Sequence, residues 1–249
     1  MSRERLDDHR RIWSEKPVLQ RMYEPWFDAL LAEVGPGRQV LEVGAGPGFM
    51  AAHARARRPD IRWVATDLLA APWNEVAADA GRLPFASASF DAVLCLDLVH
   101  HLARPRDFFA EAARVLRPGG RIAAMEPWVS PMSYPIYRWL HEEGCDLRID
   151  PWDPFAARAG AKAAFEGNGA LTWRVVRSGD ARQWAGMGLG PPRVRTINAF
   201  GYLLTLGFRR GSLLPMKLVP LAHRVDEATR ALAPLTAMRA MIVWPKITA

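Results

Sequence analysis

The sequence predicts an α/β fold in which a mostly parallel sheet carries helices on both faces. Short apolar runs alternate with helical patterns between residues 39 and 125, as in strands joined by right-handed crossover helices. A glycine-rich turn at 44–48 separates the first of these runs from the helical segment that follows it. Half of the 249 residues are hydrophobic, which is enough for a packed core.

The expected elements follow one another in a regular order. A helical lead-in at 10–34 contains Pro17 and Pro25, and we place each proline near a helix start. The chain then alternates between strands expected at 39–43, 62–66, 76–79, 88–95 and 121–125 and helices expected at 50–58 and 106–116. A stretch rich in proline and aromatic residues interrupts this order, and 194–200 and 238–244 read as two closing strands.

Composition argues for a cytoplasmic protein. No apolar run approaches the roughly 20 residues of a membrane-spanning helix. No apolar signal segment follows the charged N-terminus. Cys95 and Cys145 form no CxxC pair, which is typical of a reducing compartment and argues against zinc. We assemble no carboxylate cluster for another metal, so no metal is expected.

Positive charge is concentrated in the last quarter of the chain. Residues 193–249 hold nine Lys/Arg and two acids, which accounts for the whole formal net charge of +7. One helical face gathers Leu218, Leu221, Val225, Ala228, Leu232 and Leu235. The helix is expected to begin just after Pro220 and to end before Pro234. Two interpretations remain open: this segment lies on an anionic lipid surface, or it is a helix packed into the core.

The turn LEVGAGPGF, residues 41–49, indicates a ligand that lies against bare backbone. A dinucleotide site would show G-x-G-x-x-G, but Gly44, Gly46 and Gly48 are one residue short of that spacing. A phosphate loop would end in Lys-Ser/Thr, and here Phe49 and Met50 follow. A purely structural turn is the remaining alternative, although three glycines are costly for that purpose.

Together with three later segments, this turn resembles the first motif of the class I S-adenosylmethionine-dependent methyltransferases, in particular their small-molecule (methyltransferase type 11-like) group. The later segments are WVATDLL at 63–69, AADAGRLPFASASFDAV at 77–93 and LRPGGRIAAMEP at 116–127. The resemblance covers about 85 residues in the family's order. It implies a Rossmann-like fold whose seven-stranded sheet is mostly parallel and has an antiparallel last strand.

The resemblance also implies one domain over 1–249 and assigns a role to each part. Residues 1–36 would form a helical lid, within which Trp13, Tyr23 or Trp26 closes over the cofactor. Residues 37–126 would bind the cofactor, and the aromatic-rich insertion at 127–192 would bind the substrate. Residues 193–249 would supply the closing strands and the basic amphipathic insertion.

S-Adenosylmethionine is the implied cofactor, and S-adenosylhomocysteine is the product that it leaves. Asp67 would accept hydrogen bonds from both ribose hydroxyls, for which two carboxylate oxygens are suited, and helix capping is the alternative role. Leu68 would lie against the adenine, while Asp79 and the backbone of Ala80 would contact its amino group. The other implied cofactor-binding residues are Glu42, Gly44, Gly46, Gly48 and Asp97.

Catalytic residues are harder to identify, because methyl transfer needs mainly alignment and the removal of one proton. His100 and His101 are the candidate bases, since imidazole titrates near neutral pH. A structural role for His101 is favoured over a catalytic one. Tyr134, Tyr137 and His141 are further candidate bases of lower weight. Candidate substrate contacts are Glu126, which is expected to face the pocket, and Trp128, Tyr134 and Tyr137.

The acceptor is expected to be a small organic molecule methylated at oxygen. Nucleic acid is disfavoured, because Asp97-Leu98-Val99-His100 stands where base N-methyltransferases carry (D/N/S)-P-P-(Y/F), and Leu94, not proline, precedes Cys95. An aminopropyl transferase, an NAD-dependent oxidoreductase and a non-catalytic adenosyl-binding protein are the alternatives. The sequence gives no indication of oligomeric state.

Overall fold

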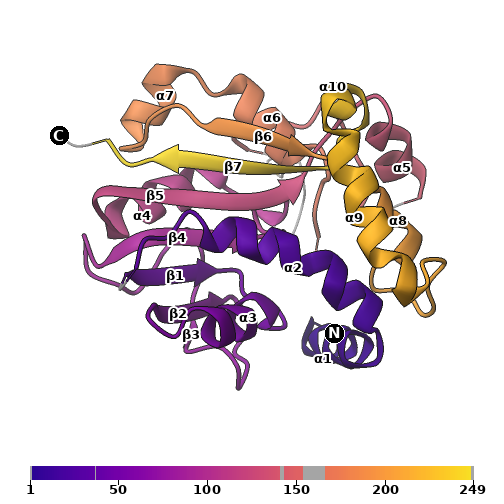
Figure 1. Cartoon of the computed structure of the whole chain (residues 1–249). Helices are drawn as coiled ribbons and strands as arrows, with labels where there is room; N and C mark the ends of the chain where they lie inside the picture. Colours follow the sequence, from indigo (N-terminus) through magenta and orange to yellow (C-terminus); the bar gives the residue numbers. More distant parts are fainter. Residues whose placement is uncertain (1, 37, 141–142, 154–165, 248–249) are drawn as a thin grey trace.

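A seven-stranded sheet in the order β3-β2-β1-β4-β5-β7-β6 forms the centre of the molecule (Figure 1). The computed structural model describes residues 2–36, 38–140, 143–153 and 166–247. β7 is antiparallel to both of its neighbours, and the remaining strands are parallel to one another. The strands are β1 Gln39–Val43, β2 Arg62–Asp67, β3 Val76–Ala77, β4 Phe90–Leu96, β5 Leu116–Pro127, β6 Arg193–Ile197 and β7 Arg239–Pro245. The expected sheet, with an antiparallel last strand, is confirmed.

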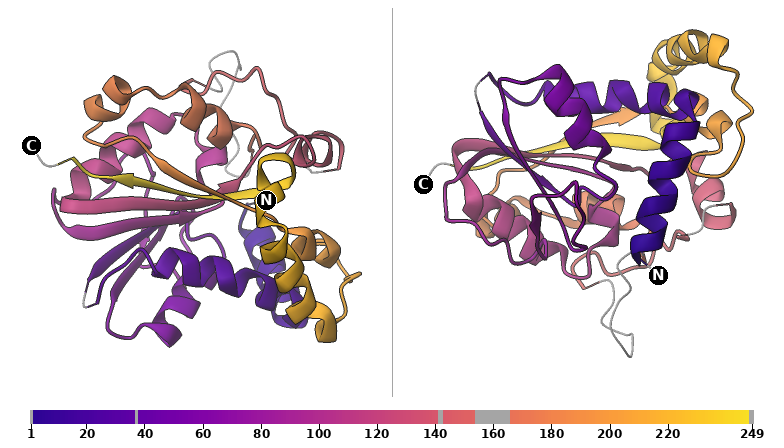
Figure 2. Two further views of the ribbon diagram at one scale, coloured as in Figure 1. Left: turned by 45° about the horizontal axis from the view of Figure 1, so that its top comes forward. Right: turned by 90° about the horizontal axis from the view of Figure 1, so that it is seen from below.

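Helices cover both faces of this sheet (Figure 2). The α-helices are α1 Ser2–Glu15, α2 Pro17–Leu31, α3 Phe49–Arg57, α4 Pro105–Val115, α5 Ser133–Trp139, α6 Leu171–Ser178, α7 Ala181–Gly186, α8 Phe200–Thr205, α9 Val219–Ala228 and α10 Ala233–Thr236. Short 3-10 turns are η1 Val99–His101, η2 Met216–Leu218 and η3 Arg230–Leu232. Apolar side chains of α2 and α3 pack on one face, and those of α4, α6 and α7 pack on the other.

Helices α6 and α7, which belong to the region expected to bind substrate, pack on the second face of the sheet. Trp184 of α7 is fully buried and makes ring contacts with Phe109 of α4 and Trp244 of β7. Helices α6 and α7 therefore serve the core. Among the described residues of the 127–192 insertion, those that line the cavity described below fall between 127 and 143. His141 falls outside the described residues.

Pro25 lies inside α2, so the expectation of a helix start at this residue is wrong. Proline has no backbone N–H, and the carbonyl of Arg21, four residues earlier, therefore lacks its helical donor. Nε2 of His223 in α9 lies 3.1 Å from that carbonyl oxygen and can donate to it. A long-range contact thus satisfies the group that the proline leaves without a helical donor.

The helix of the amphipathic segment is shorter than expected, and the structure bears on the two interpretations left open for its apolar face. Its helix begins at Val219 and ends at Ala228, and a 3-10 turn and α10 follow instead of a continuous helix. Its apolar face does not pack into the core, since Leu221 and Leu235 are 56% and 58% exposed. No helix among the described residues has both the length and the apolar character needed to cross a bilayer.

Candidate active site

A cavity of about 950 Å³ opens where β1, β2 and β4 end. The glycine turn and the residues that follow these three strands form one part of its wall. Residues of helix α1, of the segment 202–209 and of α5, including Tyr137, also line it. The carboxyl ends of parallel strands are the usual ligand-binding edge of an open α/β sheet.

The glycine turn is shaped by its surroundings as well as by its own backbone. Gly44 has a φ of 72°, and a Cβ on it would lie 2.7 Å from a methyl carbon of Leu98. Gly48, with a φ of 79°, caps α3, and a Cβ there would lie 2.6 Å from the Trp73 ring. Larger residues would be strained and would clash at both positions. The turn therefore presents bare backbone to the cavity.

Asp67, the last residue of β2, lies in the cavity wall and is held by the backbone around it. Its carboxylate accepts hydrogen bonds from Gly46 N at 2.8 Å and Leu69 N at 2.9 Å. Burial raises the pKa of Asp67, and these two backbone donors act in the opposite direction. Leu68, Asp79 and Ala80 line the same part of the cavity, and Leu68 is exposed to it. Such an exposed leucine offers an apolar face to a planar ring.

Glu42 is a buried acid in the cavity wall. Its Oε2 accepts a hydrogen bond of 2.8 Å from Trp63 Nε1. Burial raises the pKa of Glu42 to about 8, although the Trp63 donor acts against this shift. The carboxyl group is therefore largely protonated at neutral pH and has a proton of its own to donate.

Asp97 and Arg239 form a buried ion pair on the cavity wall, with 2.6 Å between Oδ1 and Nη2. Asp97 has a φ of 55°, an uncommon backbone conformation for a residue other than glycine. The antiparallel direction of β7 places its first residue, Arg239, opposite the end of β5. The guanidinium also lies over the ring of Trp26, 4.3 Å from its centroid.

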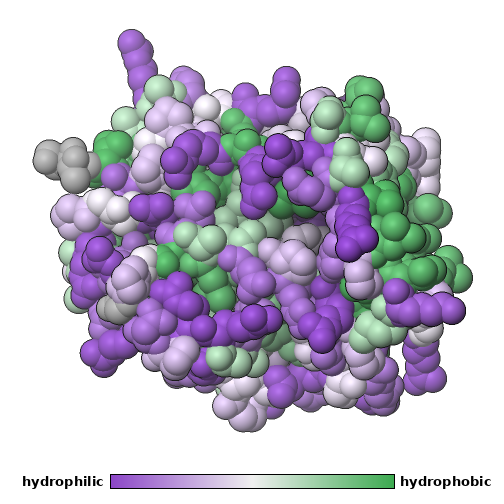
Figure 3. Space-filling view, in the orientation of Figure 1, coloured by the Kyte–Doolittle hydropathy of each residue, from purple (hydrophilic) through white to green (hydrophobic). Residues whose placement is uncertain are grey.

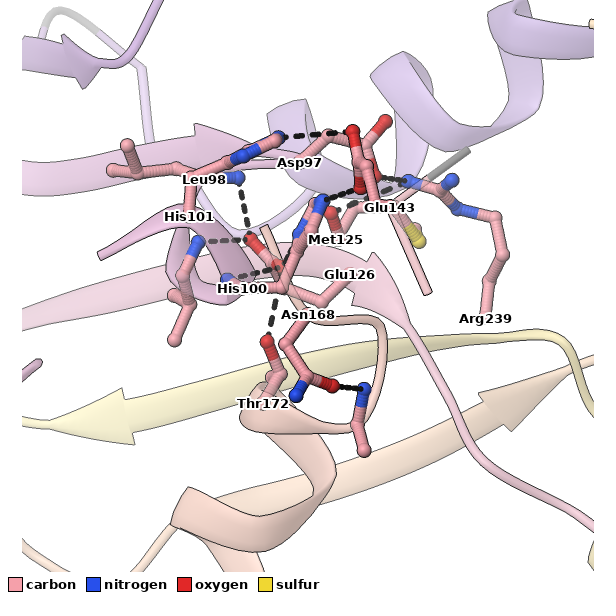
Figure 4. A network of polar contacts seen from close by, with 12 residues as sticks. Asp97, Leu98, His100, His101, Met125, Glu126, Glu143, Asn168, Thr172 and Arg239 are labelled. Atoms are coloured by element: carbon pink, nitrogen blue, oxygen red, sulfur yellow. Dashed lines mark hydrogen bonds and ion pairs between the residues drawn. The ribbon is translucent and has the colours of Figure 1, made fainter. Parts of the chain in front are cut away.

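His100 is held between two carboxylates (Figure 4). Its Nδ1 lies 2.8 Å from Glu126 Oε2, and its Nε2 lies 3.1 Å from Glu143 Oε2. Burial on its own lowers the pKa of His100, but the hydrogen bonds and charges of the two glutamates outweigh it and raise the pKa to about 10. His100 is therefore an imidazolium at neutral pH, with both nitrogens protonated.

Glu126 is fully buried and does not line the cavity, so the expectation that it faces the pocket is wrong. Its Oε1 accepts hydrogen bonds of 2.8 Å from the backbone N–H groups of Leu98 and Val99. Its Oε2 receives a hydrogen bond from Thr172 Oγ1 at 3.1 Å. Burial raises its pKa, but His100 and the two backbone donors outweigh burial and lower it. Glu126 positions His100 and the turn η1 instead of contacting a substrate.

His101 lies beside this pair, on the cavity wall. Its Nε2 is 3.5 Å from Glu143 Oε1 (Figure 4). Atoms of His100, His101 and Glu143 that are able to bind a metal ion lie within 4.8 Å of one another. The two direct contacts from Glu143 to imidazole nitrogens explain this grouping without an ion, and the absence of a metal stays a prediction.

Of the three aromatic residues that were expected to contact the substrate, one lines the cavity and two do not. Tyr137 lines the cavity, and its hydroxyl donates a hydrogen bond to the carbonyl of Met238. Trp128 and Tyr134 do not line the cavity and pack against the core, so a direct substrate contact is not supported for either. Tyr23 of α2 and Tyr202 of α8 join Tyr137 in the wall.

The N-terminal helix closes the cavity from the side, as the helical lid implies. The Trp13 ring stacks on Phe49 at 4.1 Å between centroids, and Arg10 Nη1 donates to the carbonyl of Pro47 at 2.6 Å. Trp13 does not line the cavity, whereas Tyr23 does and Trp26 supports Arg239.

Sequence reasoning missed three residues of this site: Glu143, Tyr202 and Arg239. Arg239 was detectable as the single charge beside an apolar strand, in MRAMIVW. Glu143 and Tyr202 come from segments far from the cofactor motifs, and no local pattern indicates them.

Part of this chain is similar in sequence to known methyltransferases. Residues 41–124 match the family described as "Methyltransferase domain". The ubiquinone/menaquinone biosynthesis C-methyltransferase UbiE of Paracoccus denitrificans is 32% identical over 135 residues, which cover 47% of this chain and 53% of that protein. The malonyl-[acyl-carrier protein] O-methyltransferase of Hahella chejuensis is 36% identical over 104 residues, which cover 37% of each chain. The matched region thus spans about half, or less, of the length of these curated relatives.

A solved structure shares the fold over nearly the whole chain. It is the 1,6-didemethyltoxoflavin-N1-methyltransferase of Burkholderia thailandensis, with bound 1,6-didemethyltoxoflavin and S-adenosylhomocysteine. Its TM-score is 0.51 at 17% identity, with 97% of this chain and 84% of that chain covered.

Proposed function

We propose that this chain, whose residues 41–124 match a methyltransferase domain, is a class I S-adenosylmethionine-dependent methyltransferase that methylates an oxygen of a small hydrophobic, amphiphilic or anionic molecule. One observation supports this most directly. A single cavity joins the glycine turn and Asp67 to a second region lined by tyrosines, Arg239 and His101. The first region suits an adenosyl ligand, and the second suits an acceptor with an apolar body and one polar group.

In this proposal, each residue of the first region contacts a different part of the adenosyl ligand. Asp67 has carboxylate lone pairs left after its two backbone contacts, and these accept the ribose hydroxyls. Leu68 covers the adenine, and Asp79 and Ala80 contact its amino group. Gly44 and Gly46 admit the sugar and the amino-acid chain, while Glu42 and Asp97 face that chain. Gly48 does not line the cavity, and its part is to start α3 beside Trp73. When bound, S-adenosylmethionine supplies a methyl group on a positively charged sulfur.

The second region holds the acceptor and receives its proton. His100 already carries a proton on each nitrogen, so it cannot act as the base. We assign that role to His101, because it lines the cavity and Glu143, whose Oε1 lies 3.5 Å from its Nε2, would stabilise the imidazolium that forms when it accepts a proton. The acceptor is a small molecule, and nucleic acid remains excluded from the proposal. The tyrosines bury its apolar body, and Arg239 attracts an oxygen with negative charge.

Calorimetry tests the cofactor part of the proposal. S-Adenosylhomocysteine is expected to bind, and NAD is not. In an Asp67→Asn variant the affinity for S-adenosylhomocysteine should fall by about 1–3 kcal/mol, because a ribose hydroxyl loses a carboxylate acceptor. Asp60→Asn is the matched control, since Asp60 pairs with Arg58 at the surface and should leave the affinity unchanged.

Binding of NAD without the adenosyl ligand would overturn the proposal. An unchanged affinity in the Asp67 variant would remove that residue from the cofactor site. Incubation with methyl-labelled S-adenosylmethionine and source-cell extract then tests turnover. Absence of labelled product, in spite of binding, would favour an adenosyl-binding protein without activity.

A further inference from the structure

The outer surface of the segment 204–235 is apolar although it faces solvent. Its exposed large side chains are those of Leu204, Leu206, Leu213, Met216, Leu218, Leu221, Val225, Leu232 and Leu235, here called the outer apolar face. Figure 3 shows apolar side chains gathered on the side of the molecule where α8, α9 and α10 lie. Exposed apolar patches of this size on a soluble protein generally mark an interaction surface.

The segment 204–235 is firmly attached to the rest of the fold, although its outer side is exposed. Val219 and Leu214 point inward and pack with Val18 and Met22 of α2. Lys16 Nζ donates hydrogen bonds of 2.7 and 2.9 Å to the carbonyls of Gly207 and Arg209. Anchored through its inner side, the segment keeps its leucines pointing away from the core.

Basic side chains accompany the outer apolar face. Exposed arginines and a lysine stand in the same segment, namely Arg209, Arg210, Lys217, Arg224 and Arg230, against only two acids, Asp226 and Glu227. Asp226 is turned inward, because its Oδ1 accepts the backbone N–H of Phe200 at 2.8 Å. An exposed apolar face with an excess of positive charge is complementary to anionic lipid headgroups above acyl chains.

The outer apolar face also reaches the cavity. Leu206 belongs to both, and Arg209 lines the cavity while its Nη2 donates to the carbonyl of Leu140 at 3.2 Å. Leu140 lines the cavity as well and is 68% exposed, next to Trp139, which is 73% exposed. A surface resting on this face would thus lie beside one wall of the pocket that is proposed to hold the acceptor.

We propose that the outer apolar face docks on an anionic lipid bilayer, and that the acceptor is an amphiphile that enters the cavity from that bilayer. The apolar side chains insert among the acyl chains, and the basic side chains pair with lipid phosphates. This inference rests on the proposed function for the identity of the acceptor, but the docking itself does not.

Vesicle co-sedimentation tests the docking with the full chain. The protein should bind vesicles of phosphatidylcholine with phosphatidylglycerol, and should bind pure phosphatidylcholine vesicles more weakly. Leu213→Asp with Leu221→Asp should lower the partition constant at least about tenfold, because two apolar side chains are replaced by negative charges. Ile247→Asp is the matched control: it is a similarly exposed apolar residue near the other end of the sheet, and binding should persist.

Two outcomes would overturn the docking: no sedimentation with anionic vesicles at low salt, or equal sedimentation of the Leu213/Leu221 variant and the wild type. A dimer in solution that the double variant converts to a monomer, without vesicle binding, would assign the face to a second copy instead. Calorimetry with S-adenosylhomocysteine on the same variants separates the two proposals. Its affinity should stay within about twofold, and a protein that binds vesicles but not this ligand would contradict only the proposed function.

Discussion

At the scale of single residues, the site depends on a buried set of charges that no local pattern indicates. His100 shares its two protons with Glu126 and Glu143, and Glu126 also holds the backbone of the turn η1. A buried ion pair is costly unless its remaining hydrogen-bonding groups are satisfied. Thr172 and two backbone amides satisfy Glu126 in this way. By holding His100 and the turn η1, Glu126 fixes the position of His101 in the cavity wall.

This buried pair makes the stability of the protein depend on pH. The pKa of His100 is raised to about 10, so its contribution is complete below pH 6.5 and is lost as the pH rises through 10. The free energy of unfolding by urea should therefore fall between pH 7 and pH 10. In a His100→Asn variant this loss should be smaller by an amount on the order of a few kcal/mol. Parallel pH profiles for wild type and variant would show that His100 is not the cause.

The neighbouring His101 should affect turnover instead of stability. Replacement by glutamine removes a base within reach of the acceptor, so the rate of methyl-label incorporation should drop about 10²-fold or more. The affinity for S-adenosylhomocysteine should not change. His53→Gln is the control for loss of an imidazole, because His53 of α3 pairs with Asp28 of α2 and does not line the cavity. A His101 variant with the wild-type rate would rule out its role as a base.

At the scale of elements, the β1–α3 connection shows how a strand end becomes a binding surface. The chain must turn from β1 into α3 within five residues, and the glycines at positive φ allow this. Leu98 and Trp73 then fill the space in which Gly44 and Gly48 lack side chains. The turn is thus packed from behind and open toward the cavity.

Two alanine substitutions separate these effects. Gly48→Ala and Gly211→Ala start from the same φ of 79°, but only Gly48 has a neighbour close to the new Cβ. Backbone strain alone should lower the free energy of unfolding by about 1–3 kcal/mol at either position. Gly48→Ala should cost more than Gly211→Ala, because Trp73 must also move. Equal losses in chemical denaturation would show that packing against Trp73 is unimportant.

At the scale of the whole molecule, one end of the sheet is proposed to bind ligands and one side of the fold is proposed to dock on a lipid bilayer. Residues from α1, β1, β2, β4, α5, α8 and β7 meet around the same cavity. The segment that contributes Leu206 and Arg209 to this cavity also carries the outer apolar face. Chemistry and docking are therefore connected through a single piece of chain.

Much of this could be predicted from the sequence. The strands at β1, β2 and β4 were placed within two residues at each end, because apolar runs between turn signals are strong local patterns. The residues of the cofactor motifs line one cavity, except Gly48, which caps α3 beside Trp73. Glu126 was placed at the correct strand end but on the wrong side, since side-chain direction there depends on His100 and Thr172. Trp128 and Tyr134 were chosen for residue type, and packing with distant elements gave them other neighbours.

The sequence by itself determined the α/β class, the order of the elements and the glycine turn with its following acid. Each of these depends on interactions between residues close together in the chain. Only the tertiary structure decided that Arg239 meets Asp97, that Glu143 meets His100, and that the leucines of α9 face outward. The two contacts depend on which distant segments pack side by side. Hydrophobic periodicity predicts that a helix has an apolar face, but it does not predict what that face packs against.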